Sequence, residues 1–124
     1  MVTPNILIVD DNPLNLELAC DILELEGFHV TLVESGEASI SKAAEILPDL
    51  ILMDYRMPGM SGLDTLRELR KADITKDIPI VVLTASVMAG DEDRLLIEGF
   101  DGFMQKPISP SSFAEEVMSF LKTV

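Results

Sequence analysis

Residues 5–11 read NILIVDD, a short apolar run that ends in two aspartates, Asp10 and Asp11. A second apolar run, residues 50–53, ends in the same way at Asp54. A continuous apolar run of this length is typical of a parallel strand that is covered on both faces. If the two strands are neighbours, their acidic ends meet at one edge of the sheet. Because three carboxylates repel one another unless a cation lies among them, the two runs predict a divalent metal site.

The rest of the chain alternates between strand and helix patterns. Three more strands are predicted: residues 28–33 by their composition, and residues 80–83 and 102–104 as short apolar segments. Amphipathic stretches predict five helices, over residues 13–26, 35–46, 63–70 and 91–98 and from residue 109 onward. Five strands that are each followed by a helix imply an α/β doubly wound parallel sheet with helices on both faces.

Composition limits the functions that this chain could have. Its 124 residues fit one domain over residues 1–124, and its net charge of −13 argues against binding nucleic acid. The apolar runs are too short to span a membrane, and the N-terminus does not resemble a signal peptide. Its one cysteine, Cys20, cannot form an internal disulfide. We therefore expect a cytoplasmic protein that binds neither membrane nor nucleic acid.

Function in open α/β sheets is found beyond the carboxyl ends of the strands. The residues expected there are Asp10, Asp11, Asp54, Thr84 and Lys106. Carboxylate oxygens are ligands that Mg²⁺ accepts, although an acidic turn can also simply cap a helix. Asp54 could be a third ligand, or a nucleophile that accepts a phosphoryl group.

Phosphoryl transfer needs alignment and positive charge on the transferred oxygens. A metal ion on one side and Lys106 on the other would supply that charge. Thr84 could donate its hydroxyl to a remaining phosphoryl oxygen. Taken alone, Thr84 could also be an ordinary residue at a strand end, and Lys106 an ordinary solvated lysine on the surface.

Taken in order, four motifs resemble the receiver domain of two-component response regulators over essentially the whole chain. They are Asp10-Asp11, residues 54–62, Thr84-Ala85 and Lys106-Pro107. The resemblance implies a flavodoxin-like sheet of strand order 2-1-3-4-5 with five helices. It also implies transfer of a phosphoryl group to Asp54 from a histidine kinase or a histidine phosphotransfer protein. The cofactor would be Mg²⁺, with Mn²⁺ as the alternative ion.

The resemblance also assigns roles to individual residues. It assigns metal binding to Asp10, Asp11, Asp54 and the backbone carbonyl of Arg56. It assigns contact with the phosphoryl group to Thr84 and Lys106.

Further roles concern the switch and the lifetime of the phosphate. Thr84 and Phe103 would change position on phosphorylation, although Phe103 could equally be an ordinary core residue. The face built from helix 91–98, strand 102–104 and the last helix would then change and control a downstream partner. Arg56 and Ser86 would tune hydrolysis of the phosphate. The protein would catalyse only its own phosphorylation and dephosphorylation, so we expect a signalling protein and not an enzyme.

Two surfaces are candidates for contact with partner proteins. Helix 13–26 carries two apolar stripes, one of Leu14, Leu18, Ile22 and Leu25 and one of Leu16, Ala19, Cys20 and Leu23. One stripe must pack on the sheet, and the other could dock a phosphodonor or pack against the last helix. Ile97 could contact a downstream partner or be a plain surface residue.

Three other functions are less consistent with the sequence. A phosphatase of the haloacid dehalogenase type needs a second acid two residues after the nucleophile, where Arg56 stands. A flavin module needs a phosphate loop where this chain has Asp10-Asp11. A receiver that only docks would lack site residues that are all present here. We expect a monomer, with dimerisation on phosphorylation as the alternative. The N-terminal methionine and compact end favour a stand-alone regulator over a receiver within a longer chain.

Overall fold

The computed structural model describes residues 3–84, 91–106 and 108–121, without the side chains of residues 91 and 92. Its five parallel strands form one sheet in the order β2-β1-β3-β4-β5. The strands are β1 Asn5–Val9, β2 His29–Val33, β3 Leu50–Asp54, β4 Ile80–Thr84 and β5 Gly102–Gln105. The helices are α1 Pro13–Leu25, α2 Gly36–Ile46, α3 Gly62–Lys71, α4 Asp91–Glu98 and α5 Phe113–Phe120. The predicted fold class and strand order are confirmed.

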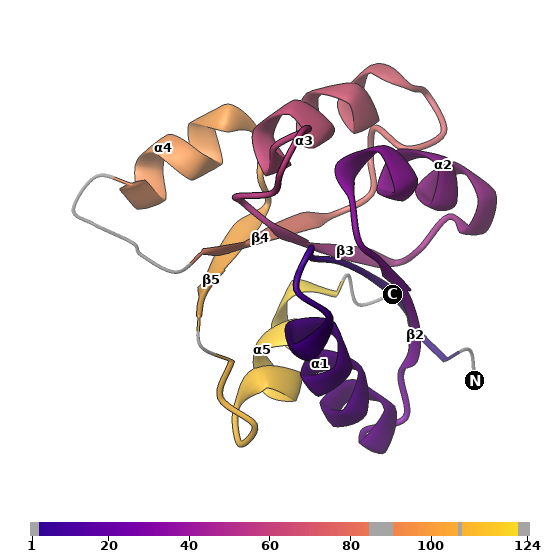
Figure 1. The fold of residues 1–124 in the computed structure, drawn as a ribbon, viewed down its shortest axis with the longest axis vertical. Helices are drawn as coiled ribbons and strands as arrows, with labels where there is room; N and C mark the ends of the chain where they lie inside the picture. The colour runs from indigo at the N-terminus through magenta and orange to yellow at the C-terminus, as the bar shows by residue number, and fades with distance from the viewer. Residues whose placement is uncertain (1–2, 85–90, 107, 122–124) are drawn as a thin grey trace.

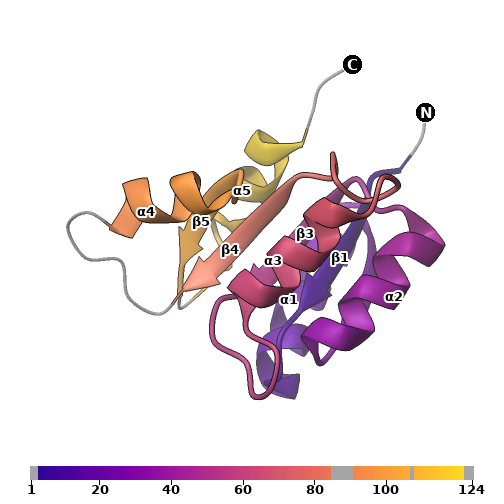
Figure 2. The ribbon, with the colours of Figure 1, turned by 90° about the horizontal axis from the view of Figure 1, so that it is seen from above.

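The helices cover both faces of the sheet, as Figure 1 shows. One core cluster joins the sheet to α1 and α5 through residues such as Leu23 and Phe113. The other joins it to α2, α3 and α4 through Ala43, Leu66 and Leu95. Figure 2 shows this second layer from above, with α3 between α4 and α2. Because the sheet is covered on both faces, the central strands are apolar along most of their length.

Local capping sets where the first three helices begin. The Asn12 side chain accepts the amide of Leu14 at 2.9 Å, and Pro13 occupies the first turn of α1. Ser35 and Ser61 cap α2 and α3 in the same way. Gly27 follows α1 at a φ of +92°, a backbone conformation that side chains other than glycine rarely adopt.

The last helix begins later than the sequence predicts. The sequence predicts its start at residue 109, whereas α5 begins at Phe113 after a turn over residues 110–112. The amides of Ser112 and Phe113 both donate to the Ser109 carbonyl, and the φ of Ser112 is −124°. This backbone angle departs from helical geometry, so the turn and the α-helix are separate elements.

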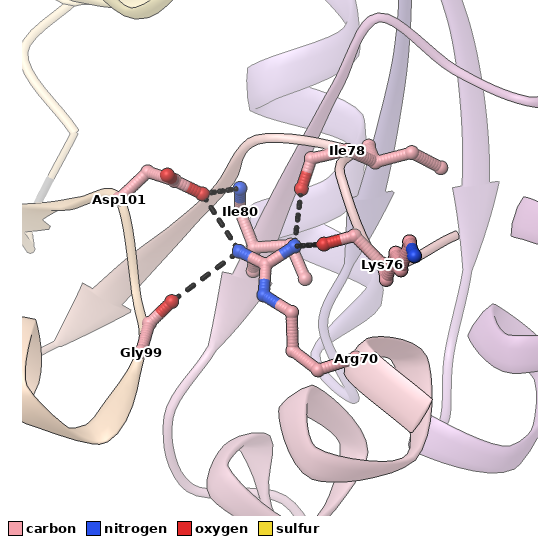
Figure 3. Close-up of polar contacts among 6 residues, drawn as sticks. All are labelled: Arg70, Lys76, Ile78, Ile80, Gly99 and Asp101. Atoms are coloured by element: carbon pink, nitrogen blue, oxygen red, sulfur yellow. Dashed lines mark hydrogen bonds and ion pairs between the residues drawn. The ribbon is translucent and has the colours of Figure 1, made fainter. Parts of the chain in front are cut away.

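Arg70 ties together the edge of the sheet where the strands begin (Figure 3). Its guanidinium donates to the carbonyls of Lys76, Ile78 and Gly99, and to the Asp101 carboxylate at 2.8 Å. Asp101 also accepts the amide of Ile80 at 2.7 Å. One side chain of α3 therefore holds the start of β4 and the end of α4 at the edge opposite the predicted site.

Within the described part of the chain, no helix has the length and apolar character needed to cross a membrane.

Candidate functional site

Three carboxylates lie together at the carboxyl edge of the sheet. Val9 of β1 is paired with Met53 of β3, so Asp10 and Asp54 extend the register side by side. One oxygen from each of Asp10, Asp11 and Asp54 lies within 4.8 Å of the others. Asp10 and Asp54 are buried, whereas Asp11 is exposed to solvent. This is the arrangement expected from the two acidic strand ends.

Lys106 joins two of these acids. Its ammonium lies 2.9 Å from the Asp10 carboxylate and 3.3 Å from that of Asp54. The lysine is positioned by its backbone, because its amide donates to the carbonyl of Thr84 at 2.7 Å. A residue near the end of the chain thus reaches the ends of β1 and β3.

The first turn of α1 orients Asp10. One Asp10 oxygen accepts the amide of Asn12 at 2.9 Å, and the other accepts the Asn15 side-chain amide at 3.3 Å. Sequence reasoning missed Asn15. Its signal was available, because a residue in the first helical turn after the Asn12 cap lies beside the strand end that precedes the cap.

The electrostatics of the site favour a bound cation. Burial raises the pKa of the Asp54 carboxyl, and the nearby Asp10 charge raises it further. Lys106 and the backbone amide of Arg56 oppose this rise without cancelling it. Negative charge therefore exceeds what the protein itself compensates. Three oxygen donors in such a setting fit Mg²⁺, which takes carboxylate ligands and keeps several waters.

The same carboxylates change the acidity of Lys106. Burial alone lowers the pKa of Lys106, but its hydrogen bond to Asp10 and the charges of Asp54 and Asp10 together raise it. The ammonium is therefore held in its charged form next to the carboxylate of Asp54. A fixed positive charge there could stabilise an anion bound to Asp54.

The loop after β3 needs a glycine close to Asp54. The amide of Gly62 donates to the Tyr55 carbonyl at 2.9 Å. A Cβ atom at Gly62 would lie 2.7 Å from the carbonyl oxygen of Asp54, closer than real Cβ atoms approach. Glycine therefore allows α3 to begin directly beside the strand end that carries Asp54.

The remaining predicted site residues lie around this cluster or beyond it. Thr84 ends β4 and is half-buried, and its carbonyl holds Lys106. Phe103 is half-buried on β5 and packs against the core under α4. The Arg56 residue is exposed. Ser86, like the proline after Lys106, lies outside the described residues.

The apolar residues of α1 divide largely along the two predicted stripes, with Ile22 as the exception. Leu16, Ala19 and Leu23 are buried in the core. Of the other stripe, Ile22 packs against the core, whereas the three leucines are exposed: Leu14, Leu18 and Leu25. Ile97 on α4 is also exposed, at 85%. Both helices thus present apolar side chains to solvent.

Cys20 is half-buried on α1. Burial raises the pKa of its thiol to about 11, and Glu24 and Asp21 add to the rise. A thiol that remains protonated at neutral pH is a poor nucleophile, in keeping with a packing role.

Comparison with known proteins gives a consistent result. The sequence model of the response regulator receiver domain matches residues 6–118. The polar-differentiation response regulator DivK of Brucella ovis is 38% identical over 120 residues, which cover 97% of this chain and 98% of that protein. DivK of Brucella suis matches to the same extent.

Two solved structures are similar over nearly their full length. The receiver domain of the sensor histidine kinase PA1611 from Pseudomonas aeruginosa, described with a magnesium ion in its active site cleft, is 31% identical with a TM-score of 0.85. The match covers 96% of this chain and 98% of that chain. The chemotaxis response regulator CheY4 of Vibrio cholerae superposes with a TM-score of 0.90, covering 97% of this chain and 100% of its own. At 24% identity this second likeness shows the fold alone.

Proposed function

Because the chain belongs to the response regulator receiver domain family, we propose that it is a switch whose Asp54 accepts a phosphoryl group. The family places it in two-component signalling. One observation carries the proposal for this chain: Asp54 lies in a three-carboxylate cluster and also contacts the Lys106 ammonium. A buried carboxylate with an adjacent fixed cation has the parts that an acyl phosphate needs.

In the proposed reaction, a carboxylate oxygen of Asp54 attacks the phosphorus of a phosphohistidine. The new P–O bond forms as the P–N bond breaks, and the imidazole nitrogen keeps the electron pair. Lys106 stabilises a phosphoryl oxygen, and the Thr84 hydroxyl donates to another. Attack of water on the phosphorus later releases phosphate and restores the carboxylate. The protein performs no chemistry beyond this cycle.

The residues proposed to hold Mg²⁺ are Asp10, Asp11, Asp54 and the backbone carbonyl of Arg56, with Mn²⁺ as the alternative ion. When bound, the cation supplies positive charge to the transferring oxygens. The magnesium described in the Pseudomonas receiver domain supports this part of the proposal by similarity. Asp10 would be oriented for this role by Asn12 and Asn15.

The proposed phosphodonor is a histidine kinase or a histidine phosphotransfer protein. The exposed leucines of α1, Leu14, Leu18 and Leu25, form an apolar surface on which it could dock. A downstream protein would bind the face of α4, β5 and α5, and Thr84 at the end of β4 would act with Phe103 of β5 as the switch. Arg56 and Ser86 would set the lifetime of the phosphate. A cytoplasmic location remains part of the proposal.

The test is the intact mass of the protein after incubation with acetyl phosphate, with and without Mg²⁺. We expect one phosphoryl adduct that requires Mg²⁺ and that is absent from Asp54→Asn. The control is Asp73→Asn, which removes an acid whose side chain is 95% exposed on the surface, and which should still be phosphorylated. A folded wild-type protein that gains no adduct would contradict the proposal.

A further inference from the structure

The side chain of Tyr55 reaches from the residue after Asp54 to α4. The Arg94 guanidinium donates to the Tyr55 hydroxyl at 2.9 Å and lies 5.5 Å from the centre of its ring. The hydroxyl itself lies 3.5 Å from a Glu98 oxygen, at the outer limit of a hydrogen bond. Glu98 and Arg94 form an ion pair one helical turn apart. One phenol therefore contacts two charged side chains of the same helix.

The backbone of Tyr55 is held beside the candidate site. Its amide donates to the Leu83 carbonyl at 3.0 Å, and its carbonyl accepts the amide of Gly62. Leu83 immediately precedes Thr84 in β4. A shift of the peptide between these two residues, toward or away from Asp54, would therefore pull on Tyr55 directly. This contact chain runs from the site to α4 through residues that the structure describes.

The carboxyl-terminal end of α4, where Glu98 lies, is also held by Arg70 of α3. Gly99, just after the helix, has its carbonyl bonded to Arg70, whose guanidinium also bonds Asp101 and two further carbonyls (Figure 3). The side chain of Arg94, by contrast, is 47% exposed. Since α4 lies at the end of its helix layer (Figure 2), it could pivot about the Arg70 end when the Tyr55 contact changes.

We propose that Tyr55, through Arg94 and Glu98, is a positioning residue that latches α4 while Asp54 carries no phosphoryl group. The inference rests on the proposed function and adds a route by which the site acts on α4. Because coupling between two sites is reciprocal, a weaker latch makes the phosphorylated arrangement easier to reach. Loss of the latch should therefore tighten binding of a phosphoryl analogue at Asp54.

Tyr55 provides its own spectroscopic signal. The chain contains one tyrosine and no tryptophan, so its intrinsic fluorescence comes from Tyr55. We expect this emission to rise when beryllofluoride and Mg²⁺ bind to the wild-type protein, because the hydroxyl leaves the Glu98 carboxylate. A tyrosine that keeps its contact with Glu98 would not gain emission by this route.

Affinities for beryllofluoride, measured by fluorine NMR, test the coupling. Tyr55→Phe keeps the ring and removes the hydroxyl, and Arg94→Gln removes its charged partner. Each should bind beryllofluoride about 3- to 10-fold more tightly than wild type, the range given by one net hydrogen bond. The double variant should gain little more than either single variant. Arg67→Gln, which removes an exposed arginine of α3, is the matched control and should bind as wild type does.

Hydrogen exchange gives a second readout that needs no ligand. In Tyr55→Phe, amides of α4 should exchange faster while those of α2 remain unchanged. If wild type binds beryllofluoride with no change in emission, or if both variants bind it as wild type does, the latch is wrong. If no variant binds beryllofluoride and no phosphoryl adduct forms, the proposed function fails, and the latch fails with it.

Discussion

At the scale of single residues, the negative charges of the candidate site outnumber the positive charge that Lys106 brings to it. Asp10, Asp11 and Asp54 bring three negative charges within 4.8 Å of one another, whereas Lys106 brings one positive charge. The lysine bonds both buried acids and leaves Asp11 at the solvent-facing side. The excess negative charge favours binding of a cation. Without a cation, repulsion among the carboxylates destabilises the folded protein.

This penalty predicts how Asp54 affects stability in metal-free buffer. Since burial, together with the Asp10 charge, raises the pKa of Asp54 in the folded protein, the folded state holds the Asp54 proton more tightly than the unfolded chain does. Ionisation of Asp54 as pH rises therefore lowers stability, and at neutral pH wild type carries the whole penalty. We expect Asp54→Asn to raise the free energy of unfolding at neutral pH by about 1 kcal/mol, the scale of a single stabilising substitution.

The difference should shrink as pH falls through the raised pKa toward 3.8, the ordinary value for this group. Urea denaturation of both proteins across this range, with a chelator present, measures it. An Asp54→Asn protein that is less stable than wild type at neutral pH would mean that pairing with Lys106 outweighs burial and repulsion.

At the scale of helices and strands, two devices hold the elements around the site. Caps such as Asn12 decide where each helix begins, and so how the acids at the preceding strand end are oriented. Arg70 acts over a longer range, joining α3 to the start of β4 and to the end of α4. Its planar group serves several acceptors at once, which a lysine ammonium cannot reproduce.

We therefore expect Arg70→Lys to be strongly destabilising although it keeps the positive charge. Loss of several hydrogen bonds, one of them charge-assisted, should lower the free energy of unfolding by about 2–3 kcal/mol. Urea denaturation measures the change. Arg67→Lys on the exposed face of the same helix is the control, and it should remain within about 0.5 kcal/mol of wild type. Equal effects of the two substitutions would show that the Arg70 contacts add little.

At the scale of the whole molecule, the parallel sheet brings residues that are far apart in the sequence to one edge. All five strands are parallel, so the residues that follow β1, β3, β4 and β5 emerge at the same end. Helices on both faces bury the central strands β1, β3 and β4, while Asp11 at this edge is exposed to solvent. A ligand that binds at this edge in the folded protein, but does not bind the unfolded chain, stabilises the whole domain.

Added Mg²⁺ should therefore stabilise the protein against unfolding. At about 100 times its dissociation constant, we expect a gain of about 2.7 kcal/mol in the free energy of unfolding. Asp11→Asn should lose most of this gain, because it removes one carboxylate of the proposed metal site. Asp11 is exposed, so the substitution leaves the core intact. Thermal melts at increasing Mg²⁺ measure the effect, with Asp73→Asn as the control that keeps it. If wild type gains nothing from Mg²⁺, the proposed metal site is wrong.

The sequence by itself determined the kinds of elements and their order, because strand and helix periodicities are local properties of the chain. It also placed Asp10, Asp11 and Asp54 at strand ends, since the acids directly follow apolar runs. The start of α5 was predicted wrongly, because a serine and a proline can open a turn as readily as a helix.

Only the tertiary structure decided which side chains meet. Three kinds of contact depend on how separate elements pack. Lys106 and Asn15 bond Asp10, and Arg94 contacts Tyr55. The exposure of three leucines on α1 depends on packing in the same way. Periodicity states which face of a helix is apolar, but not how far a neighbouring element covers it. The register and twist of the sheet set those distances, and they arise only when all five strands and their helices pack together.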